Sequence, residues 1–446
     1  MRTIKIKEGL DLPIKGSPKQ EITDTKMPIR VAILGDDYAG LKPTMAVTLG
    51  DKVKLGQLLF TDKKMPGVKY TSPGAGKVVG IHRGPKRRFL SVVVELDGDS
   101  EVTFKAYSAD DAKNLSSDKI KDQLLESGLW TAMRSRPFGK VANPADSPHS
   151  IFINGMDTKP LAPSVPVTLK GKEESFKLGV ELLSKLVEDK TYVTIKPGEE
   201  VPVPQISSLE VVAFDGPHPA GLPGTHIHFL DPAGRNKTVW HVDAQHVAAI
   251  GVLFSTGKLN MDRIVAIAGP SVNEPRLIKT RVGARISEIV EGELSSGENR
   301  IISGSVLSGF KAEGPEDFLG FFEQLITVLP ENRKRYFLGW LLPPFGIHSI
   351  KNLTFFPGKN YNFDTALNGA LRPIVPIGSY EKVMPLDIIP NYLLRALAVE
   401  DVEESESLGC LELVEEDLAL CTYVCPSKVI HGENLRRNLT TIEKEG

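Results

Sequence analysis

Between residues 140 and 260 the sequence alternates short apolar runs with longer amphipathic segments. The runs at 150–155 and 209–216 have the length and composition of buried strands. The segments at 175–189 and 246–259 instead repeat apolar residues every three or four positions, which predicts helices. Strands that alternate with helices are typical of an α/β domain with a parallel sheet. This part of the chain is therefore predicted to form a layered α/β domain.

The rest of the chain needs further domains, because 446 residues are more than one hydrophobic core usually holds. Apolar strands separated by turns precede the α/β part, and a helix is predicted at 116–128. A further helix is predicted at 316–330, where apolar residues recur every three or four positions. The expected fold class is therefore α+β, with several domains. The predicted regions are an N-terminal region with a small β barrel (1–110), an α/β domain (111–260), a small β unit with a following helix (261–330) and a mostly helical C-terminal domain (331–446).

The composition excludes some classes of function. The formal net charge of −2 gives no overall attraction to nucleic acid, and no nucleic-acid partner is expected. Three cysteines are too few to brace a chain of this length, which favours a reducing, cytosolic setting. No apolar run reaches the ~18 residues that a membrane-spanning helix needs. The sequence also lacks the glycine patterns of dinucleotide and phosphate loops and the G-x-S-x-G nucleophile pattern.

Residues 50–81 resemble a biotinyl/lipoyl-type barrel. In such modules a lysine at a hairpin tip carries a swinging prosthetic group, and Lys63 and Lys64 stand at a comparable position. The predicted strand at 57–63 is several residues shorter than in lipoyl domains, which would misplace either lysine. A purely structural barrel is therefore the favoured interpretation.

Near the C-terminus, LALCTYVCPSK has part of the spacing of an iron–sulfur site. A bacterial ferredoxin run is C-x2-C-x2-C-x3-C-P, and Cys421 and Cys425 match its last two ligands. The first two ligands would then fall on Glu415 and Leu418, and leucine cannot ligate iron. Cys410 is out of register. Buried cysteines in a helical segment are therefore favoured over an intact four-iron cluster.

The segment 216–232 is rich in glycine, proline and histidine, which predicts a tight loop that can approach a ligand closely. On a strand, His226 and His228 would point the same way, as ligands of one metal do. No carboxylate or cysteine stands at a zinc-like spacing from them. Hydrogen-bonded turn histidines are therefore favoured, and no metal ligand is assigned.

Four separated motifs resemble one family. They are MRTIKIKEGLDLPIKGSP, LGDDYAGLKPTMAVTLGDKV, GPHPAGLPGTHIHFLDP and ALCTYVCPSK. Together, and in this order, they are similar to the A subunit of the bacterial Na⁺-translocating NADH:quinone reductase. The resemblance runs from the first residues to residue 430. It implies a Rossmann-like α/β domain and a β-grasp unit of the SLBB type near 263–290.

That family is similar in turn to two cofactor-bearing ones, the C subunit of the Rnf complex and the flavin subunit of respiratory complex I. In those relatives a glycine-rich loop after a helix holds flavin phosphate, but here the stretch from Trp130 to Phe138 contains no glycine. Where the relatives carry acidic residues facing the nucleotide, this chain has Asp157 and Lys159. The cysteine pattern is also incomplete. The resemblance therefore implies a chain that keeps the fold and carries no cofactor.

The function implied by the resemblance is that of a peripheral subunit on the cytoplasmic face of the bacterial inner membrane. The complex would be a translocase that oxidises NADH, reduces ubiquinone and exports sodium, with flavins and iron centres in other subunits. The isolated chain is expected to be inactive. Its expected partners are the other subunits, above all a membrane subunit on which it docks. Ubiquinone is a candidate ligand, and the residues expected to shape its site are Trp130, Phe138, Gly221, His226 and His228.

Two alternatives are left open by the sequence. In the first, the chain is a flavin- or iron–sulfur-bearing NADH dehydrogenase subunit whose motifs still bind their cofactors. In the second, it is an interaction protein with no link to redox chemistry.

Overall fold

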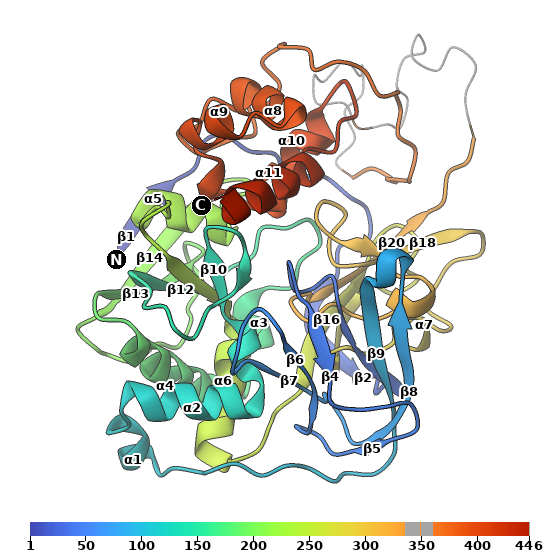
Figure 1. The fold of residues 1–446 in the computed structure, drawn as a ribbon. Coiled ribbons are helices and arrows are strands. Elements are labelled where there is room, and N and C mark those ends of the chain that lie inside the picture. Colours follow the sequence, from blue (N-terminus) through green and yellow to red (C-terminus); the bar gives the residue numbers. More distant parts are fainter. Residues whose placement is uncertain (335–347, 349–359, 446) are drawn as a thin grey trace.

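The computed structural model describes residues 1–334, 348 and 360–445. Within these ranges it contains four β sheets and a group of helices near the C-terminus, which Figure 1 shows above the α/β layers. The α+β multidomain class expected from the sequence is confirmed. No helix in the described ranges combines the length and the apolar character needed to cross a membrane.

The barrel is built from two sheets that share one core. The sheets have the strand orders β3-β9-β8-β5 and β4-β6-β7. Apolar side chains from both, such as Val31, Val92 and Phe60, are buried in the same cluster. Lys63 and Lys64 follow β6 directly and are exposed. The bounds are β3 (Arg30–Leu34), β4 (Pro43–Met45), β5 (Lys52–Val53), β6 (Leu58–Asp62), β7 (Lys69–Thr71), β8 (Gly76–Arg83), β9 (Phe89–Leu96) and the 3-10 turn η1 (Pro85–Arg87).

The α/β sheet has seven strands in the order β1-β14-β13-β12-β15-β10-β11. The first five in this order are parallel, and β10 and β11 add an antiparallel edge. The bounds are β1 (Arg2–Lys5), β10 (Arg134–Arg136), β11 (Lys140–Val141), β12 (Ser150–Asn154), β13 (Lys190–Ile195), β14 (Leu209–Asp215) and β15 (Val239–Asp243).

Helices cover both faces of this sheet, so the predicted layered α/β domain is confirmed. One face packs with α2, α4 and α6, and the other packs with α5 (Figure 1). The predicted helices at 116–128, 175–189 and 246–259 are present, and Gly128 ends the first of them in a left-handed conformation. The bounds are α1 (Ala109–Lys113), α2 (Ser117–Ser127), η2 (Leu129–Ala132), α3 (Val165–Thr168), α4 (Glu173–Leu183), η3 (Ser184–Leu186), α5 (Pro223–Leu230) and α6 (Ala244–Thr256).

A third sheet follows, in the order β19-β18-β20-β16-β17-β2. Its edge strand β2 comes from the N-terminal segment, whose first strand β1 lies at the edge of the α/β sheet, so this segment joins the two sheets. The bounds are β2 (Lys19–Thr25), β16 (Asp262–Ala268), β17 (Arg276–Arg281), α7 (Ile286–Ile289), β18 (Asn299–Ser303), β19 (Phe310–Lys311), η4 (Gly314–Glu316) and β20 (Leu325–Pro330).

The prediction of a helix at 316–330 was wrong. Its second half is the strand β20, which pairs with β16 on one side and β18 on the other. Ile326, Thr327 and Val328 are β-branched and fully buried, and such residues pack well in a central strand. Tertiary pairing therefore overrides the helical spacing of the aromatic residues that precede them.

The C-terminal part is helical from residue 390 onward. Residues 360–389 contain no helix, so the mostly helical region predicted from 331 starts later among the described residues, and 335–347 and 349–359 lie outside them. The helices enclose one core, in which Leu393, Leu420 and Leu439 are buried. The bounds are α8 (Pro390–Val399), α9 (Val402–Ser407), η5 (Cys410–Glu412), η6 (Glu415–Leu418), α10 (Ala419–Val424) and α11 (His431–Glu445).

Candidate functional site

The α/β sheet reverses its strand order at β12. β13 and β14 lie on one side of β12 and β15 lies on the other, which is the order of a Rossmann half-sheet. In open α/β sheets, ligands bind beyond the carboxyl ends of the strands at this switch point. Asp157 and Lys159 follow β12 closely, and β15 ends at Asp243. Charged side chains therefore surround the position where the topology predicts a ligand.

Seven charged residues form what we call the strand-end cluster. Two arginines come from β10, which pairs with β15, and two carboxylates come from η6 in the C-terminal part. The members are Arg134, Arg136, Asp157, Lys159, Asp243, Glu416 and Asp417. The positive charges of the sheet domain thus face negative charges that include two from the C-terminal part.

The closest contact in the cluster joins Arg136 to Asp417. The Arg136 side chain is fully buried, and its Nη1 donates to Asp417 Oδ2 at 2.7 Å and to the carbonyl of Glu412 at 2.9 Å. Its Nη2 lies 3.5 Å from Glu416 Oε1, at ion-pair distance. Asp417 also accepts from the backbone N–H of Val414 at 2.8 Å. This charge-assisted contact holds the C-terminal part to the sheet.

Asp417 also lies against the first turn of α5. A Cβ atom added to Gly224, the second residue of α5, would lie only 2.1 Å from Asp417 Oδ1. The amino end of a helix carries partial positive charge and suits an anion such as a phosphate. Asp417 therefore occupies the space beside this turn, although its Oδ1 accepts no hydrogen bond from the described residues.

The other pairs of the strand-end cluster are longer. Lys159 Nζ lies 3.6 Å from Asp157 Oδ2, and Arg134 Nη2 lies 3.8 Å from Asp243 Oδ2. Burial would raise the pKa of Glu416, but the neighbouring cations, Arg134 first among them, outweigh burial and hold that pKa below its usual value. Burial likewise works to lower the pKa of Lys159, but nearby carboxylates, above all Asp157, raise it. Glu416 and Lys159 are therefore both charged at neutral pH.

The stretch from Trp130 to Phe138 has no glycine that could line a cradle for a phosphate, and Gly128 and Gly139 only flank it. Trp130 is fully buried, donates its Nε1–H to the carbonyl of Ala142 at 2.7 Å and makes an edge contact with Trp240. Phe138 is half-buried and packs against the C-terminal core. Both aromatic rings are therefore used in packing within the chain.

Residues 223–230 of the histidine segment form the helix α5 rather than a strand, whereas residues 216–222 form the tight loop that was expected. Pro223 stands at the first helical position, where proline is well tolerated. Residues two positions apart lie on nearly opposite sides of a helix, so His226 and His228 diverge. Nε2 of His226 donates to the carbonyl of Ala220 at 2.9 Å, and its Nδ1 lies 3.0 Å from Thr194 Oγ1. Burial lowers the pKa of His226 to about 3, so the ring is neutral.

His228 contacts the C-terminal part instead. Its Nδ1 lies 2.7 Å from Glu412 Oε2, and its Nε2 accepts from the backbone N–H of Asp387 at 3.0 Å. Gly221 is buried, and its N–H donates to Thr158 Oγ1 at 2.8 Å. The ring nitrogens of both histidines are thus taken by hydrogen bonds. Over the described ranges, no group of three metal-ligating side chains comes together.

The three cysteines are buried in the apolar core of the C-terminal part. Cys421 lies in α10, Cys425 follows its last residue, and Cys410 opens η5. Burial raises the pKa of Cys410 and that of Cys421 to about 12, so both are protonated thiols at neutral pH. Leu418, at the position of a missing ligand, is fully buried in the same core. Buried thiols in such a core contribute to its packing.

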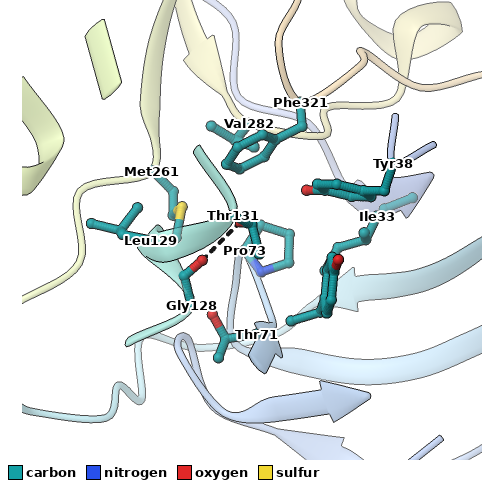
Figure 2. A pocket seen from close by; sticks show the side chains of 12 residues that line it. Ile33, Tyr38, Thr71, Pro73, Gly128, Leu129, Thr131, Met261, Val282 and Phe321 are labelled. Atoms are coloured by element: carbon teal, nitrogen blue, oxygen red, sulfur yellow. Dashed lines mark hydrogen bonds between the residues drawn. The ribbon is translucent and has the colours of Figure 1, made fainter. Parts of the chain in front are cut away.

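A small cavity lies between the barrel, η2 and the third sheet, and Figure 2 shows the side chains around it. Its lining includes Tyr38, Thr131, Met261 and Phe321. The side chains leave about 20 Å³ of space between them. As it stands, this space suits about one water and is too narrow for an aromatic ring. None of the five residues expected to contact quinone lines it.

Asp37 holds Phe321, which lines this cavity, by a hydrogen bond. Its Oδ2 accepts from the backbone N–H of Phe321 at 2.9 Å, and the ring of Phe321 lies 5.9 Å from that of Tyr38. Burial raises the pKa of Asp37 to about 8, with the Phe321 N–H opposing the shift and the charge of Glu323 adding to it. The carboxyl group is therefore mostly protonated at neutral pH.

The central ion pair could not be found from sequence patterns. Arg136 and Asp417 are 281 positions apart, and no spacing motif joins them. A weak signal was present, because Glu416 and Asp417 interrupt an apolar segment that leads to Cys421. Adjacent carboxylates in such a segment need a buried partner.

Family models match three parts of the chain. A model described as the NqrA N-terminal barrel-sandwich hybrid domain matches residues 4–97. A model described as the NqrA second alpha/beta domain matches residues 115–259. A third, described as the NQRA C-terminal domain, matches residues 264–314. These ranges correspond to the barrel, the α/β sheet with its helices, and most of the third sheet.

Relatives of known name are similar over the whole chain. The A subunit of the Na⁺-translocating NADH-quinone reductase of Pasteurella multocida is 50% identical over 445 residues, covering 99% of this chain and 100% of that protein. The protein of the same name from Pseudomonas aeruginosa is 51% identical over 447 residues, with the same coverage of both chains. Among solved structures, an NAD⁺-reducing [NiFe]-hydrogenase in the air-oxidized state aligns with a TM-score of 0.37 and 15% identity, covering 50% of this chain and 49% of its own. That similarity is too distant to support an argument.

Asp417→Asn removes the closest carboxylate of a guanidinium that has no access to water. We expect the free energy of unfolding, measured by urea titration, to fall by about 3–5 kcal/mol, because Arg136 is left buried without full compensation. The matched control is Glu415→Gln in the same element, whose partly exposed pair with Arg436 is worth about 1 kcal/mol or less. Equal losses in the two variants would contradict the central position given to Asp417.

Asp37→Asn changes the pH dependence of stability. The pKa of Asp37 is about 8 in the folded state and lies above the ordinary value of 3.8, so the wild type loses stability as the pH rises between these values. Asparagine cannot ionise and still accepts the N–H of Phe321. Urea unfolding at about pH 6 and about pH 8.5 should show a smaller loss in the variant than in the wild type. The control is Asp36→Asn, an exposed neighbour, which should follow the wild type; a parallel profile for Asp37→Asn would disprove the shift.

Proposed function

The chain belongs to the NqrA family, the A subunits of Na⁺-translocating NADH–quinone reductases, and we propose that it serves its complex without a cofactor of its own. Its partners are other subunits of that complex. In this proposal the NADH, flavin and iron chemistry belongs to those subunits. This chain acts as a docking and scaffolding component.

The observation that supports the cofactor-free role most strongly is the Arg136–Asp417 pair. It lies in the strand-end cluster, where a sheet of this topology usually receives its ligand. A flavin phosphate bound there would have to displace Asp417 from the first turn of α5 and leave Arg136 without its closest counter-charge. Breaking a buried pair in this way costs several kcal/mol.

Two further features point in the same direction. The segment from Trp130 to Phe138 packs its aromatic rings into the cores, where the cofactor-bearing relatives have glycines. Cys421 is a protonated thiol, and Leu418 replaces a ligand in the cysteine pattern. In this proposal, the residues at both of these positions pack within the protein instead of binding a cofactor.

The docking part of the proposal rests on the name of the relatives. A complex that translocates Na⁺ needs segments that span the bilayer, so its A subunit must attach to a membrane subunit directly or through another subunit. We place the chain at the cytoplasmic face of the membrane, because NADH is a cytoplasmic substrate.

A part in shaping the ubiquinone site also belongs to the proposal. The five residues first expected there stay a prediction: Gly221, His226 and His228 lie in or next to α5, and Trp130 and Phe138 pack in different cores. The cavity of Figure 2 has a more suitable lining, with aromatic rings and a threonine hydroxyl, but it must widen to hold a ring. In the assembled complex, a photoreactive ubiquinone analogue should label the segments around Tyr38 or Thr131. Labels confined to other subunits would contradict this part.

The cofactor-free role is tested by the flavin and iron content of the purified chain. We expect a colourless protein with neither group in stoichiometric amount, because the strand-end cluster and the cysteine core are closed by protein groups. As a control in the assembled complex, Cys421→Ser with Cys425→Ser should keep NADH–quinone reductase activity, apart from a packing loss of about 1–3 kcal/mol in stability. Stoichiometric flavin or iron would instead support the alternative of a flavin- or cluster-bearing subunit.

A further inference from the structure

Residues 367–380, which we call the strap, run along the C-terminal part without helix or strand. Several of the strap's apolar side chains point into solvent: Leu371 is 74% exposed, Leu367 62% and Val375 44%. Over the described ranges, thirteen large apolar side chains are exposed, and eight of them lie at or after residue 367. Four of the eight, Leu367, Leu371, Val375 and Ile377, lie within eleven positions of one another in the strap, so exposed apolar side chains follow closely there.

Hydrogen bonds to Ser427, on the side facing the C-terminal core, hold the strap in place. The backbone N–H of Arg372 donates to the carbonyl of Ser427 at 3.0 Å, and the hydroxyl of Ser427 donates to the carbonyl of Pro373 at 2.7 Å. Ser427 is 1% exposed, and Ile374 packs on the C-terminal core. The outward direction of Val375 is therefore set by fixed neighbours on the inner side.

The strap is held by the segment that contains the cysteine motif. Ser427 belongs to the Cys-Pro-Ser-Lys end of that motif, and the hydroxyl of Tyr380, at the end of the strap, lies 3.1 Å from Cys425 Sγ. At the other end of the strap, a Cβ on Gly369 would lie 2.7 Å from Lys428 Cε, so the two segments are in close contact. The loop that would bind a cluster in the cofactor-bearing relatives thus presents a surface segment here.

The unpaired backbone groups and the low charge of the strap indicate which kind of partner it fits. In the described part of the chain, the backbone N–H groups of Ala370, Leu371, Ile374 and Val375 have no hydrogen-bond partner. Lipid hydrocarbon would leave these groups unpaired, whereas an extended polypeptide can pair with them. Arg372 is the one charged residue of the strap, so a neutral, apolar segment is the best match.

We infer that the strap is the surface on which an extended, apolar segment of another subunit of the complex docks. That segment covers Leu371 and Val375 and adds hydrogen bonds to the free N–H groups of these two residues and of Ile374. The inference rests on the proposed docking role and names the surface that performs it.

The test is site-specific photo-crosslinking in the assembled complex. A benzophenone amino acid is placed at Leu371 or at Val375, and the matched control position is Leu49, which is 68% exposed on the barrel. We expect both strap positions to cross-link to another subunit, whereas the Leu49 position should give no such product.

Several outcomes would overturn the inference. Cross-links from the strap to lipid, to a second copy of this chain or to nothing would each do so. If another surface position cross-linked while the strap did not, the docking role would stand and the strap would be the wrong surface. If the chain failed to co-purify with the other subunits at all, the proposed function itself would fall.

Charge substitution gives an independent readout. Leu371→Asp combined with Val375→Asp should lower the amount of chain retained by the complex by about tenfold, because a carboxylate would be buried in an apolar contact. Leu49→Asp is the control. The Tm of the isolated chain should be unchanged in both variants, since the substituted side chains are exposed. Equal retention of the strap variant and the control would contradict the inference.

Discussion

A guanidinium withdrawn from water needs a compensating charge, and this need ties the end of the chain to the α/β sheet. Arg136 of β10 meets that need in Asp417, which the backbone of Val414 also holds in place. Because Asp417 lies against the first turn of α5 as well, one contact fixes the relative positions of the sheet, this helix and the C-terminal part. The region where an open α/β sheet usually binds its ligand is used here for an internal contact.

Two other side chains also fill positions at which a cofactor site would need open groups. Trp130 fills the main core where a phosphate loop would need exposed backbone, and Leu418 fills the C-terminal core where a cluster would need a thiolate. The loop that includes Cys425 and Ser427 contacts the strap at Pro373 and at its last residue, Tyr380. These positions therefore serve contacts within the chain and, as we infer, a contact with a partner.

Local sequence patterns predicted a helix or strand correctly where the spacing of apolar residues matches the side chains that are buried in the fold. The helix at 246–259 and the strand at 150–155 were predictable because apolar spacing and burial coincide there. At 316–330 the spacing of aromatic residues predicted a helix, but strand pairing on both sides of β20 decided the structure. In α5 the proline and glycines suggested a loop, although proline is also favoured at the first position of a helix. The Arg136–Asp417 pair was beyond such reasoning, because a contact across 281 positions leaves no local pattern.

The central claim is that the ligand position of the sheet is closed by the protein's own carboxylates. It is tested most directly by titrating flavin mononucleotide into the purified chain and following the flavin fluorescence. If Asp417 and Glu416 fill the position, the fluorescence should change only in proportion to the added flavin, with no saturable binding. Saturable, stoichiometric binding that competes with inorganic pyrophosphate would show that the strand-end cluster still accepts a nucleotide, and would contradict the claim.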